Sequence, residues 1–483
     1  MKRKRQKIIL RLTVWTVFSF LTFLQSQTLD KAVFAQRRVK LMEQMDDGIA
    51  VFKNSSVKRR SGDVDYKYRP ASDFYYLSGF KYPDAIFMLI PDAEKSFILF
   101  VKPKSAAVSQ WFGDLPGIEG AMETFGADTA YAIEEFENIL TQFLLGKKRL
   151  YFDIRNEDLY NTLQSSLRGL GSGAPQEMVN VMPLVHELRL IKGPEELRLL
   201  RKTIDITGDG IIEVMKAAES GMYEYELDAI LDYVFRKNGC PRKGFPSIVG
   251  SGKQSTIFHY EDNDRKISDG DIVVMDVGAE YGYYSADITR TIPINGKFSK
   301  RQKAIYELVL KAQEAAIKEM MPGKPCFGNM KSAGKVVREG LYKLGLITDK
   351  ESSWQHWLYY YPFISHGLGL DTHDAGDYGE YFQGGINLEP GMVLTVEPGI
   401  YIGDNLIAAF RNTAMHYLKA SEEDVDSFLK EIKPVFDQYK PLGTRIEDDI
   451  LITETGNENL SKKVPRTVKD IEKMMKKRSY LNQ

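Results

Sequence analysis

Two aspartates, Asp276 and Asp287, lie on either side of a glycine-containing stretch. If Tyr281-Gly282 is a two-residue hairpin turn, its strands place the two carboxylates directly opposite each other, with Cβ atoms about 5 Å apart. Carboxylates that face each other within apolar strands repel, and burial increases this cost unless a cation lies between them. The pair therefore indicates a metal site, although a solvated turn aspartate is the simpler interpretation of either residue alone.

Three more residues are candidates for the same site. His366 lies beside glycines that permit close backbone approach, and a neutral imidazole is a common metal ligand. Glu397 ends an apolar strand at a Pro-Gly pair. Glu447 lies on another strand beside Arg445, whose guanidinium could form an ion pair with a ligand carboxylate. Taken one at a time, a hydrogen-bonded core histidine and mixed-charge strand edges explain these residues without a metal.

Taken together, these residues form a hard, oxygen-rich donor set of four carboxylates and one imidazole. Such a set can hold two divalent ions and suits Mn, Co, Fe or Zn better than a thiolate site would. Two ions about 3.5–4 Å apart can share a water, lower its pKa and present it as hydroxide to a carbonyl carbon. The chemistry predicted is hydrolysis of an amide bond.

The elements that position these residues fall into two parts. Apolar runs of strand length occur at 48–52, 86–90, 97–101 and 150–154, between helical stretches, which predicts a small α/β domain over residues 28–185. Helices are predicted at 194–218, 223–236, 299–321 and 327–344, and β-branched runs from 267 onward predict an antiparallel sheet. We therefore expect an α+β domain over residues 186–483.

Residues 404–443 look like an insertion between Glu397 and Glu447. Ser421 and Asp424 resemble a helix capping box, with Asp in the place of Glu. The apolar positions that follow share one helix face and are Val425, Phe428, Leu429 and Ile432. This pattern predicts a surface helix, and a lid over the site is the alternative.

The composition limits the class of protein. A chain of 483 residues with 43% hydrophobic and 27% charged residues is expected to be folded, in two domains. The 65 basic and 66 acidic residues give a net charge of -1, which offers no electrostatic basis for binding nucleic acid. Cys240 and Cys326 allow one disulfide at most, and two buried free thiols are the preferred interpretation.

The N-terminus has the pattern of an export signal. Basic residues at 2–7 precede an apolar run from Leu12 to Leu24, and Gln25-Ser26-Gln27 follows it. The run is too short to span a bilayer comfortably, so residues 1–27 are predicted to be a cleaved signal peptide. We expect a periplasmic or extracellular protein, with an uncleaved membrane anchor as the alternative.

The motifs around the five candidate ligands resemble those of aminopeptidase P, a family related to prolidase and methionine aminopeptidase. They are Met275-Asp276-Val277-Gly278, Ala286-Asp287-Ile288-Thr289-Arg290, Ser365-His366-Gly367-Leu368-Gly369, Val396-Glu397-Pro398-Gly399 and Arg445-Ile446-Glu447-Asp448-Asp449. The segment Ser72-Asp73-Phe74-Tyr75-Tyr76 is similar to the N-terminal part of the same family. The resemblance implies a creatinase-like N-terminal domain followed by a pita-bread metallopeptidase domain.

The resemblance also assigns roles to the metal ligands. Asp276 and Glu447 would bridge two divalent ions, which are expected to be manganese, with cobalt, iron or zinc as alternatives. Asp287 would chelate one ion, and His366 and Glu397 would complete the site of the other. Glu397 would also accept a proton from the bridging water.

Other residues match catalytic and substrate-binding positions of the family. His259 matches a histidine near the scissile peptide, and His373 one that stabilises the oxyanion. Asp63 and Tyr378 match residues of the substrate site. Trp111 resembles a tryptophan that a neighbouring subunit offers to the pocket, which implies a homo-oligomer (a dimer or tetramer), whereas core packing is the alternative interpretation of this residue.

Three positions depart from the family pattern. Pro362 replaces a further histidine, Phe245 replaces a tyrosine near the ligands, and Phe382 stands where the pocket has an arginine. These changes leave the five ligands intact but weaken the case for strict selection of proline.

The function implied is removal of the N-terminal residue from peptides with proline in second position. A prolidase-type Xaa-Pro dipeptidase is the first alternative. A non-catalytic binding module on the same fold is the second, and it is disfavoured because such modules typically lose ligand residues.

Overall fold

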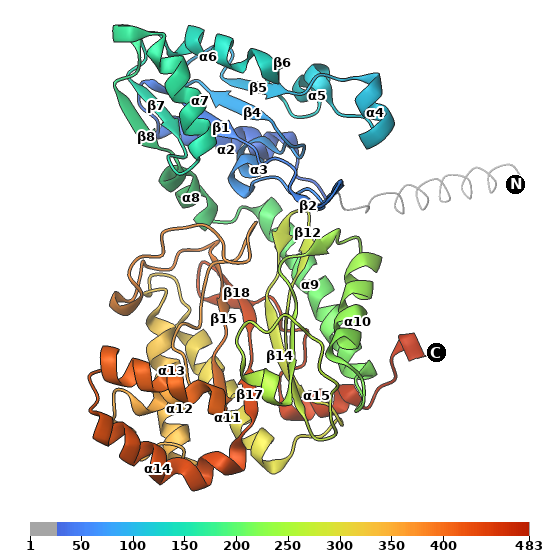
Figure 1. Ribbon diagram of the computed structural model, residues 1–483, viewed down its shortest axis with the longest axis vertical. Helices are drawn as coiled ribbons and strands as arrows, with labels where there is room; N and C mark the ends of the chain where they lie inside the picture. Colours follow the sequence, from blue (N-terminus) through green and yellow to red (C-terminus); the bar gives the residue numbers. More distant parts are fainter. Residues whose placement is uncertain (1–26, 483) are drawn as a thin grey trace, which may run out of the picture.

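The computed structural model describes residues 27–482, so the predicted signal peptide, apart from Gln27, lies outside the described residues. Figure 1 shows two lobes, a smaller N-terminal one and a larger C-terminal one. Within residues 27–482, none of the helices combines the length and the apolar character needed to cross a bilayer. The predicted domain boundary at residue 185 falls inside helix α8 (Met182–Leu190), which joins the lobes, and the division stays a prediction.

The N-terminal lobe is built on a mixed six-stranded sheet with the order β6-β5-β4-β1-β7-β8. Its strands are β1 (Gly48–Lys53), β4 (Ile86–Leu89), β5 (Phe97–Val101), β6 (Thr129–Ala132), β7 (Arg149–Phe152) and β8 (Glu177–Asn180). The pairs β1–β4 and β4–β5 are antiparallel, and the other pairs are parallel. All four predicted strands are present, with ends displaced by two residues at most.

Alternation along β1 explains how this sheet carries helices on both faces. Ile49 and Val51 join a core with α6 (Phe136–Leu144) and α7 (Glu157–Arg168). Ala50 and Phe52, which point the other way, join the main core together with residues of α2 (Lys31–Glu43) and α3 (Ser72–Ser78). The main core continues without interruption into the C-terminal lobe.

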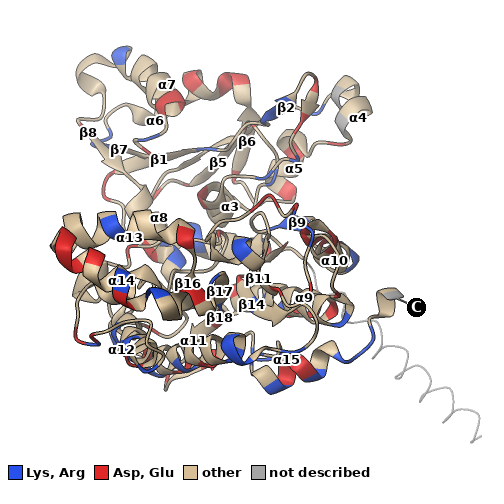
Figure 2. Ribbon diagram, turned by 60° about the horizontal axis from the view of Figure 1, so that its bottom comes forward, with Lys and Arg blue, Asp and Glu red and all other residues tan. Residues whose placement is uncertain are grey.

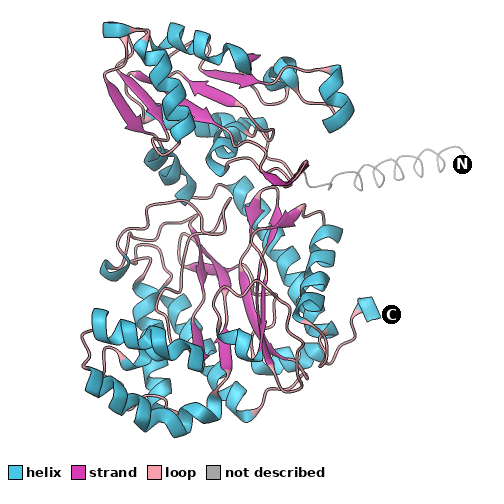
Figure 3. Cartoon of the chain, viewed as in Figure 1, coloured by secondary structure: helices cyan, strands magenta, loops and turns pink. Residues whose placement is uncertain are grey.

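The C-terminal lobe places antiparallel strands between helix pairs (Figure 3). The central strands are β10 (Ile248–Ser251), β11 (Ile272–Val277), β14 (Ile288–Pro293), β15 (Val393–Val396), β16 (Gly399–Ile402), β17 (Leu442–Arg445), β18 (Asp448–Ile452) and β19 (Asn457–Asn459). The helices are α9 (Pro194–Ala217), α10 (Glu224–Lys237), α11 (Lys300–Glu319) and α12 (Gly328–Lys343). These four helices confirm the predicted ones within two residues at either end.

The insertion forms a helical layer on the outside of this lobe. It comprises α13 (Ile407–Asn412), a π-helical turn (Thr413–Tyr417) and α14 (Glu422–Tyr439). The side chain of Ser421 accepts the backbone N–H of Asp424, so the predicted cap is present. Val425, Phe428 and Ile432 are buried, and Phe428 packs against Trp354.

Charged residues are interspersed over both lobes (Figure 2). One acidic group lies in the first turn of α14, at Glu422, Glu423 and Asp424, where it suits the positive end of the helix dipole. Cys240 and Cys326 are buried free thiols, which confirms the interpretation preferred from the sequence.

Candidate metal centre

The hairpin that carries the two aspartates turns one residue later than predicted. Tyr281 of β12 (Ala279–Tyr281) pairs with Tyr284 of β13 (Tyr284–Ser285), so the turn residues are Gly282 and Tyr283. Their φ angles of 59° and 72° suit a tight hairpin turn that needs positive φ at both central positions. The ring of Tyr283 packs 4.4 Å from that of Tyr75, a tertiary contact that supports the strained conformation and that the sequence does not reveal.

This register changes what faces Asp276. Asp276 pairs with Thr289 rather than with Asp287, so the two aspartates are diagonal neighbours on one face of the sheet. The Thr289 hydroxyl donates to Glu447 Oε2 at 2.7 Å and accepts from Arg445 Nε at 3.2 Å. The predicted direct opposition was therefore wrong: Thr289 stands opposite Asp276, and its hydroxyl binds Glu447 and Arg445.

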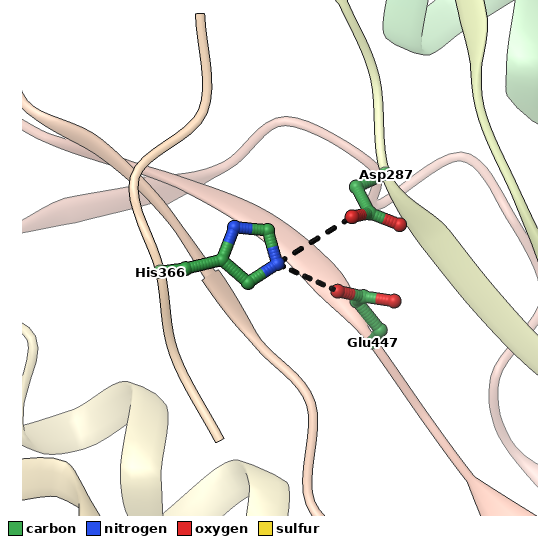
Figure 4. A group of neighbouring side chains, drawn as sticks. All are labelled: Asp287, His366 and Glu447. Carbon is green, nitrogen blue, oxygen red and sulfur yellow. Dashed lines mark ion pairs between the residues drawn. The ribbon is translucent and has the colours of Figure 1, made fainter. Parts of the chain in front are cut away.

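The five predicted ligands line one cavity, and three of the carboxylates lie within 4.0 Å of His366 Nε2. His366 Nε2 lies 3.5 Å from Asp287 Oδ2 and 4.0 Å from Glu447 Oε1 (Figure 4). It also lies 3.4 Å from Glu397 Oε1. Single ligand atoms of Asp287, His366 and Glu447 all lie within 4.8 Å of one another. Backbone pairing fixes this arrangement, because Thr395 N–H donates to His366 O and Glu397 N–H to Ile364 O, each at 2.9 Å.

The carboxylates of this cluster are crowded and desolvated. Burial, followed by repulsion from Glu447 and Asp276, raises the pKa of Asp287 well above its ordinary value. Burial, followed by repulsion from Glu397 and Asp276, also raises the pKa of Glu447 well above its ordinary value. Burial also raises the pKa of Glu397, against the opposing effects of His366 and Arg445. Without a cation, this cluster therefore disfavours its own ionised form.

Two oxygens of the cluster lack partners in the part of the chain that is described. Asp276 Oδ1 and Asp287 Oδ1 are buried and accept no hydrogen bond from the protein. An unpartnered buried polar atom costs about 1–3 kcal/mol, and a carboxylate more. Hard divalent cations take oxygen and imidazole ligands of this kind, so the residues fit a metal centre.

Arg445 holds one side of the cluster. Its guanidinium forms an ion pair with Asp276 and donates to Tyr401 Oη at 3.0 Å. Because both residues are buried, the charge of Arg445 fixes the orientation of the Asp276 carboxylate.

Two supporting residues were not assigned a role from the sequence. Asp449 Oδ2 accepts from the backbone N–H of Asp287 at 3.4 Å, and burial raises the pKa of Asp449 well above its ordinary value. Fully buried Arg290 pairs with Asp448 at 2.7 Å and donates to the backbone oxygen of Glu447 at 2.6 Å. Strand alternation from Arg445 could have identified Asp449, whereas the partners of Arg290 depend on tertiary structure.

His259 and His373 line the same cavity as the cluster, which has a volume of about 890 Å³. The rings of His373 and His366 lie 4.2 Å apart between centroids. Partial desolvation, together with the charges that His366 and His259 can carry, lowers the pKa of His373 to about 4. His373 is therefore a neutral hydrogen-bonding group at pH 7.

Three predicted substrate-binding residues do not line this cavity. Trp111, in α4 (Ala106–Phe112), is 80% exposed, so its core-packing interpretation was wrong. Asp63 is exposed in the turn between β2 (Arg59–Ser61) and β3 (Val64–Asp65). The Tyr378 hydroxyl is buried against Gly367. None of these three side chains therefore lines the cavity in a single copy of the chain, although Tyr378 packs against Gly367, next to His366.

Comparison with known proteins gives this geometry a family. The sequence profile described as metallopeptidase family M24 matches residues 198–454, which include all five predicted ligands. The chain belongs to metallopeptidase family M24. A second profile, the aminopeptidase P N-terminal domain, matches residues 34–151 and places the chain in the aminopeptidase P branch of M24. The family and the two-domain fold expected from the sequence motifs are thereby confirmed.

Individual M24 proteins are similar along nearly the whole chain. Xaa-Pro aminopeptidase of Escherichia coli is 38% identical over 92% of this chain and 97% of its own length. The structure of Pseudomonas aeruginosa aminopeptidase PepP matches with a TM-score of 0.84 and 34% identity, over 93% of this chain and 99% of that one. E. coli aminopeptidase P, solved with the inhibitor Pro-Leu, matches with a TM-score of 0.83 and 35% identity, over 93% and 98% of the two chains.

Proposed function

We propose that this chain hydrolyses the first peptide bond of peptides whose second residue is proline. The observation that carries the proposal is the cluster of Asp287, Glu397 and Glu447 around His366, inside a cavity large enough for a peptide end. The similarity to E. coli Xaa-Pro aminopeptidase over 92% of the chain supports the choice of substrate.

The cluster residues divide the work between binding and proton transfer. Asp276, Asp287, His366, Glu397 and Glu447 are the proposed ligands of two divalent ions. Ions bound there would supply Lewis acidity and lower the pKa of water for attack on an amide carbonyl. Of the three carboxylates beside His366, that of Glu397 is the least buried. Glu397 therefore accepts a proton on the cavity side.

The two cavity histidines act on the peptide. His373, neutral at pH 7, donates a hydrogen bond to the oxygen that becomes negative during attack. His259, exposed on the cavity wall, orients the peptide beside it. Arg445 acts through Asp276, which it holds in position.

The composition of the cavity wall favours an aminopeptidase over a dipeptidase. A dipeptide ends in a carboxylate one residue beyond the scissile bond, and a site built for it needs a cation there. Among the described residues that line the cavity there is no lysine, and the single arginine, Arg445, is already paired with Asp276. A longer peptide, whose next group is a neutral amide, fits this wall better.

Manganese is the proposed metal, with cobalt, iron and zinc as the competing candidates. An oxygen-rich set with one imidazole suits manganese, and this preference is tested by metal analysis of the chain purified without chelator. About two manganese ions per chain would support the proposal, whereas two zinc ions per chain would identify zinc as the metal instead.

Export and self-association complete the proposal. The basic and apolar pattern of residues 1–27 supports export to the periplasm or cell exterior, and N-terminal sequencing of the mature protein tests it. The 80% exposure of Trp111 supports a dimer or tetramer in which one copy offers this side chain to another. Light scattering and activity measurements at decreasing protein concentration test that arrangement. A monomer whose specific activity stays the same on dilution would contradict it.

The activity is tested with three peptides on the chain lacking residues 1–27. Metal-loaded protein is expected to release alanine from Ala-Pro-Gly at least roughly tenfold faster than from Ala-Ala-Gly or the dipeptide Ala-Pro. Faster turnover of Ala-Pro would support the dipeptidase alternative. Failure to cleave any of the three with metal bound would favour the binding-module alternative.

A further inference from the structure

A continuous row of aromatic rings leads out of the cavity. We call it the aromatic rim, and it consists of Phe382, Phe363, Tyr361, Phe258 and Tyr401. Ring centroids in that order are separated by 5.7, 4.9, 6.0 and 4.6 Å. Segments from distant parts of the sequence thus build one apolar surface.

The aromatic rim connects the metal cluster to solvent. At the inner end, Tyr401 Oη accepts a hydrogen bond from Arg445, the partner of Asp276. At the outer end, Phe382 is 74% exposed and Tyr361 48% exposed. All members except Phe382 line the cavity. The rim therefore marks a path from the reacting centre to the mouth.

Two rings of the aromatic rim, Tyr361 and Phe363, are held by neighbouring aromatic rings. Trp357 packs edge-on against Tyr361 at 6.0 Å, and Tyr381 packs against Phe363 at 4.7 Å. The Tyr381 hydroxyl donates to the backbone oxygen of Ser365 at 2.6 Å, next to His366. The rings of Tyr361 and Phe363 are thus fixed in place, and covering them with another apolar group costs little conformational entropy.

Charge on the cavity wall also affects which side chains can lie along the aromatic rim. Beyond the five predicted ligands, Glu261 is the one carboxylate among the described residues that line the cavity. It lies close in sequence to Phe258, so an acidic side chain near this part of the rim would be repelled. An apolar side chain meets no such cost.

We propose that the aromatic rim selects peptides that carry a large apolar residue directly after the proline. This inference rests on the proposed aminopeptidase activity. An enzyme that removes one residue keeps that residue at the inner side of the cluster, and the remainder of the peptide must leave through the mouth. The residue after proline then lies along the rim, where an aromatic or large aliphatic side chain is desolvated against the rings.

The test compares three peptides that differ only in the third residue: Ala-Pro-Phe-Gly, Ala-Pro-Gly-Gly and Ala-Pro-Glu-Gly. For the metal-loaded chain, kcat/KM for the phenylalanine peptide is expected to exceed that for the glycine peptide by roughly tenfold, with the glutamate peptide slowest. F382S and Y361S are each expected to reduce the phenylalanine-to-glycine ratio to about twofold, mainly through KM.

Y417S is the matched control for these variants. Tyr417 is 74% exposed, like Phe382, but lies in the insertion and does not line the cavity, so Y417S should keep the tenfold ratio. Thermal melts confirm that each variant is folded. A phenylalanine-to-glycine ratio near one in the unmodified chain, or a ratio that F382S and Y361S leave unchanged, overturns the proposal that the aromatic rim selects the third residue. In either case, cleavage of Ala-Pro-Gly-Gly still supports the aminopeptidase activity. If no proline peptide is cleaved, the activity fails and the rim proposal fails with it.

Discussion

At the scale of single residues, the site depends on placing more negative charge in one cavity than the protein alone can stabilise. Asp287 and Glu447 are buried, their pKa values are raised, and an oxygen of Asp287 lacks any partner among the described residues. Arg445 and Thr289 stabilise only one side of the cluster. Divalent cations would remove the remaining cost, so ligand geometry and metal affinity are linked here.

Replacing His373 separates catalysis from metal binding. H373A is expected to lower kcat for Ala-Pro-Gly by about 10²–10³-fold, because it removes a hydrogen-bond donor that acts on the developing oxyanion. Steady-state kinetics and metal analysis check this expectation. KM and metal content should hardly change, and H416A, at an exposed histidine of the insertion, should behave as the unmodified chain. Loss of metal in H373A would contradict the assigned role.

Replacing Arg445 should have the opposite signature. R445M leaves the Asp276 carboxylate without its ion pair, and metal affinity is expected to fall by about 10–100-fold. Competition with a chelating dye measures this change. R411M is the control, since Arg411 pairs with Asp426 on the surface of the insertion. Equal metal affinity in R445M and R411M would show that Arg445 has no influence on the ligands.

At the scale of elements, local patterns predicted most of the framework. Helix α9 begins at Pro194 as the sequence indicates, and the cap at Ser421 starts α14. The hairpin register was missed because Tyr283 adopts a positive φ that its contact with Tyr75 supports. Such support comes from another lobe of the molecule, and no local signal carries it.

The packing of the insertion can be tested at Phe428. Its ring is buried and lies 5.3 Å from Trp354 and 5.8 Å from Phe410, so F428A should destabilise this layer by about 3–5 kcal/mol. Limited proteolysis between residues 404 and 443 should become faster. L429A, at a partly buried position of the same helix, should have a clearly smaller effect. Equal cleavage rates in both variants would mean that the aromatic contacts do not hold the layer.

His356, in the 3₁₀ turn Gln355–Leu358 that contacts α13, makes the stability of the chain depend on pH. Burial, followed by the charge of Arg338, lowers the pKa of His356 to about 4 from an ordinary value near 6.5. The unfolded chain therefore binds a proton that the folded chain excludes, and the stabilisation present above pH 6.5 is lost as the pH falls toward 4. Between pH 6.5 and pH 4 the loss approaches about 1.4 kcal/mol per pH unit for this one group.

Thermal melts of the metal-free chain at pH 7.5 and pH 5 measure this effect. H356Q is expected to show a smaller drop in Tm between the two pH values than the unmodified chain, whereas H416Q should show the same drop. An identical drop in H356Q would assign the pH dependence to other groups.

At the scale of the whole molecule, the two lobes are joined beside the site. Arg189 of α8 is buried and binds Asp73 of the N-terminal lobe at 2.6 Å, and Asp371 and Asp374 next to His373 at 2.7 and 2.5 Å. Both lobes therefore fix the loop that carries His373. The metal cluster could be predicted from the sequence because each motif contains its own ligand. The role of Arg189 could not, because its partners are distant from it along the chain.

The cluster around His366 is expected to bind the metal on which Xaa-Pro aminopeptidase activity depends. Titration of the chelator-treated chain with Mn²⁺, while release of alanine from Ala-Pro-Gly is followed, tests this expectation. We expect no activity before metal is added, a rise that saturates at about two ions per chain, and no rise in H366A. Cleavage that persists without metal, or full activity in H366A, would show that this cluster is not the metal centre on which the activity depends.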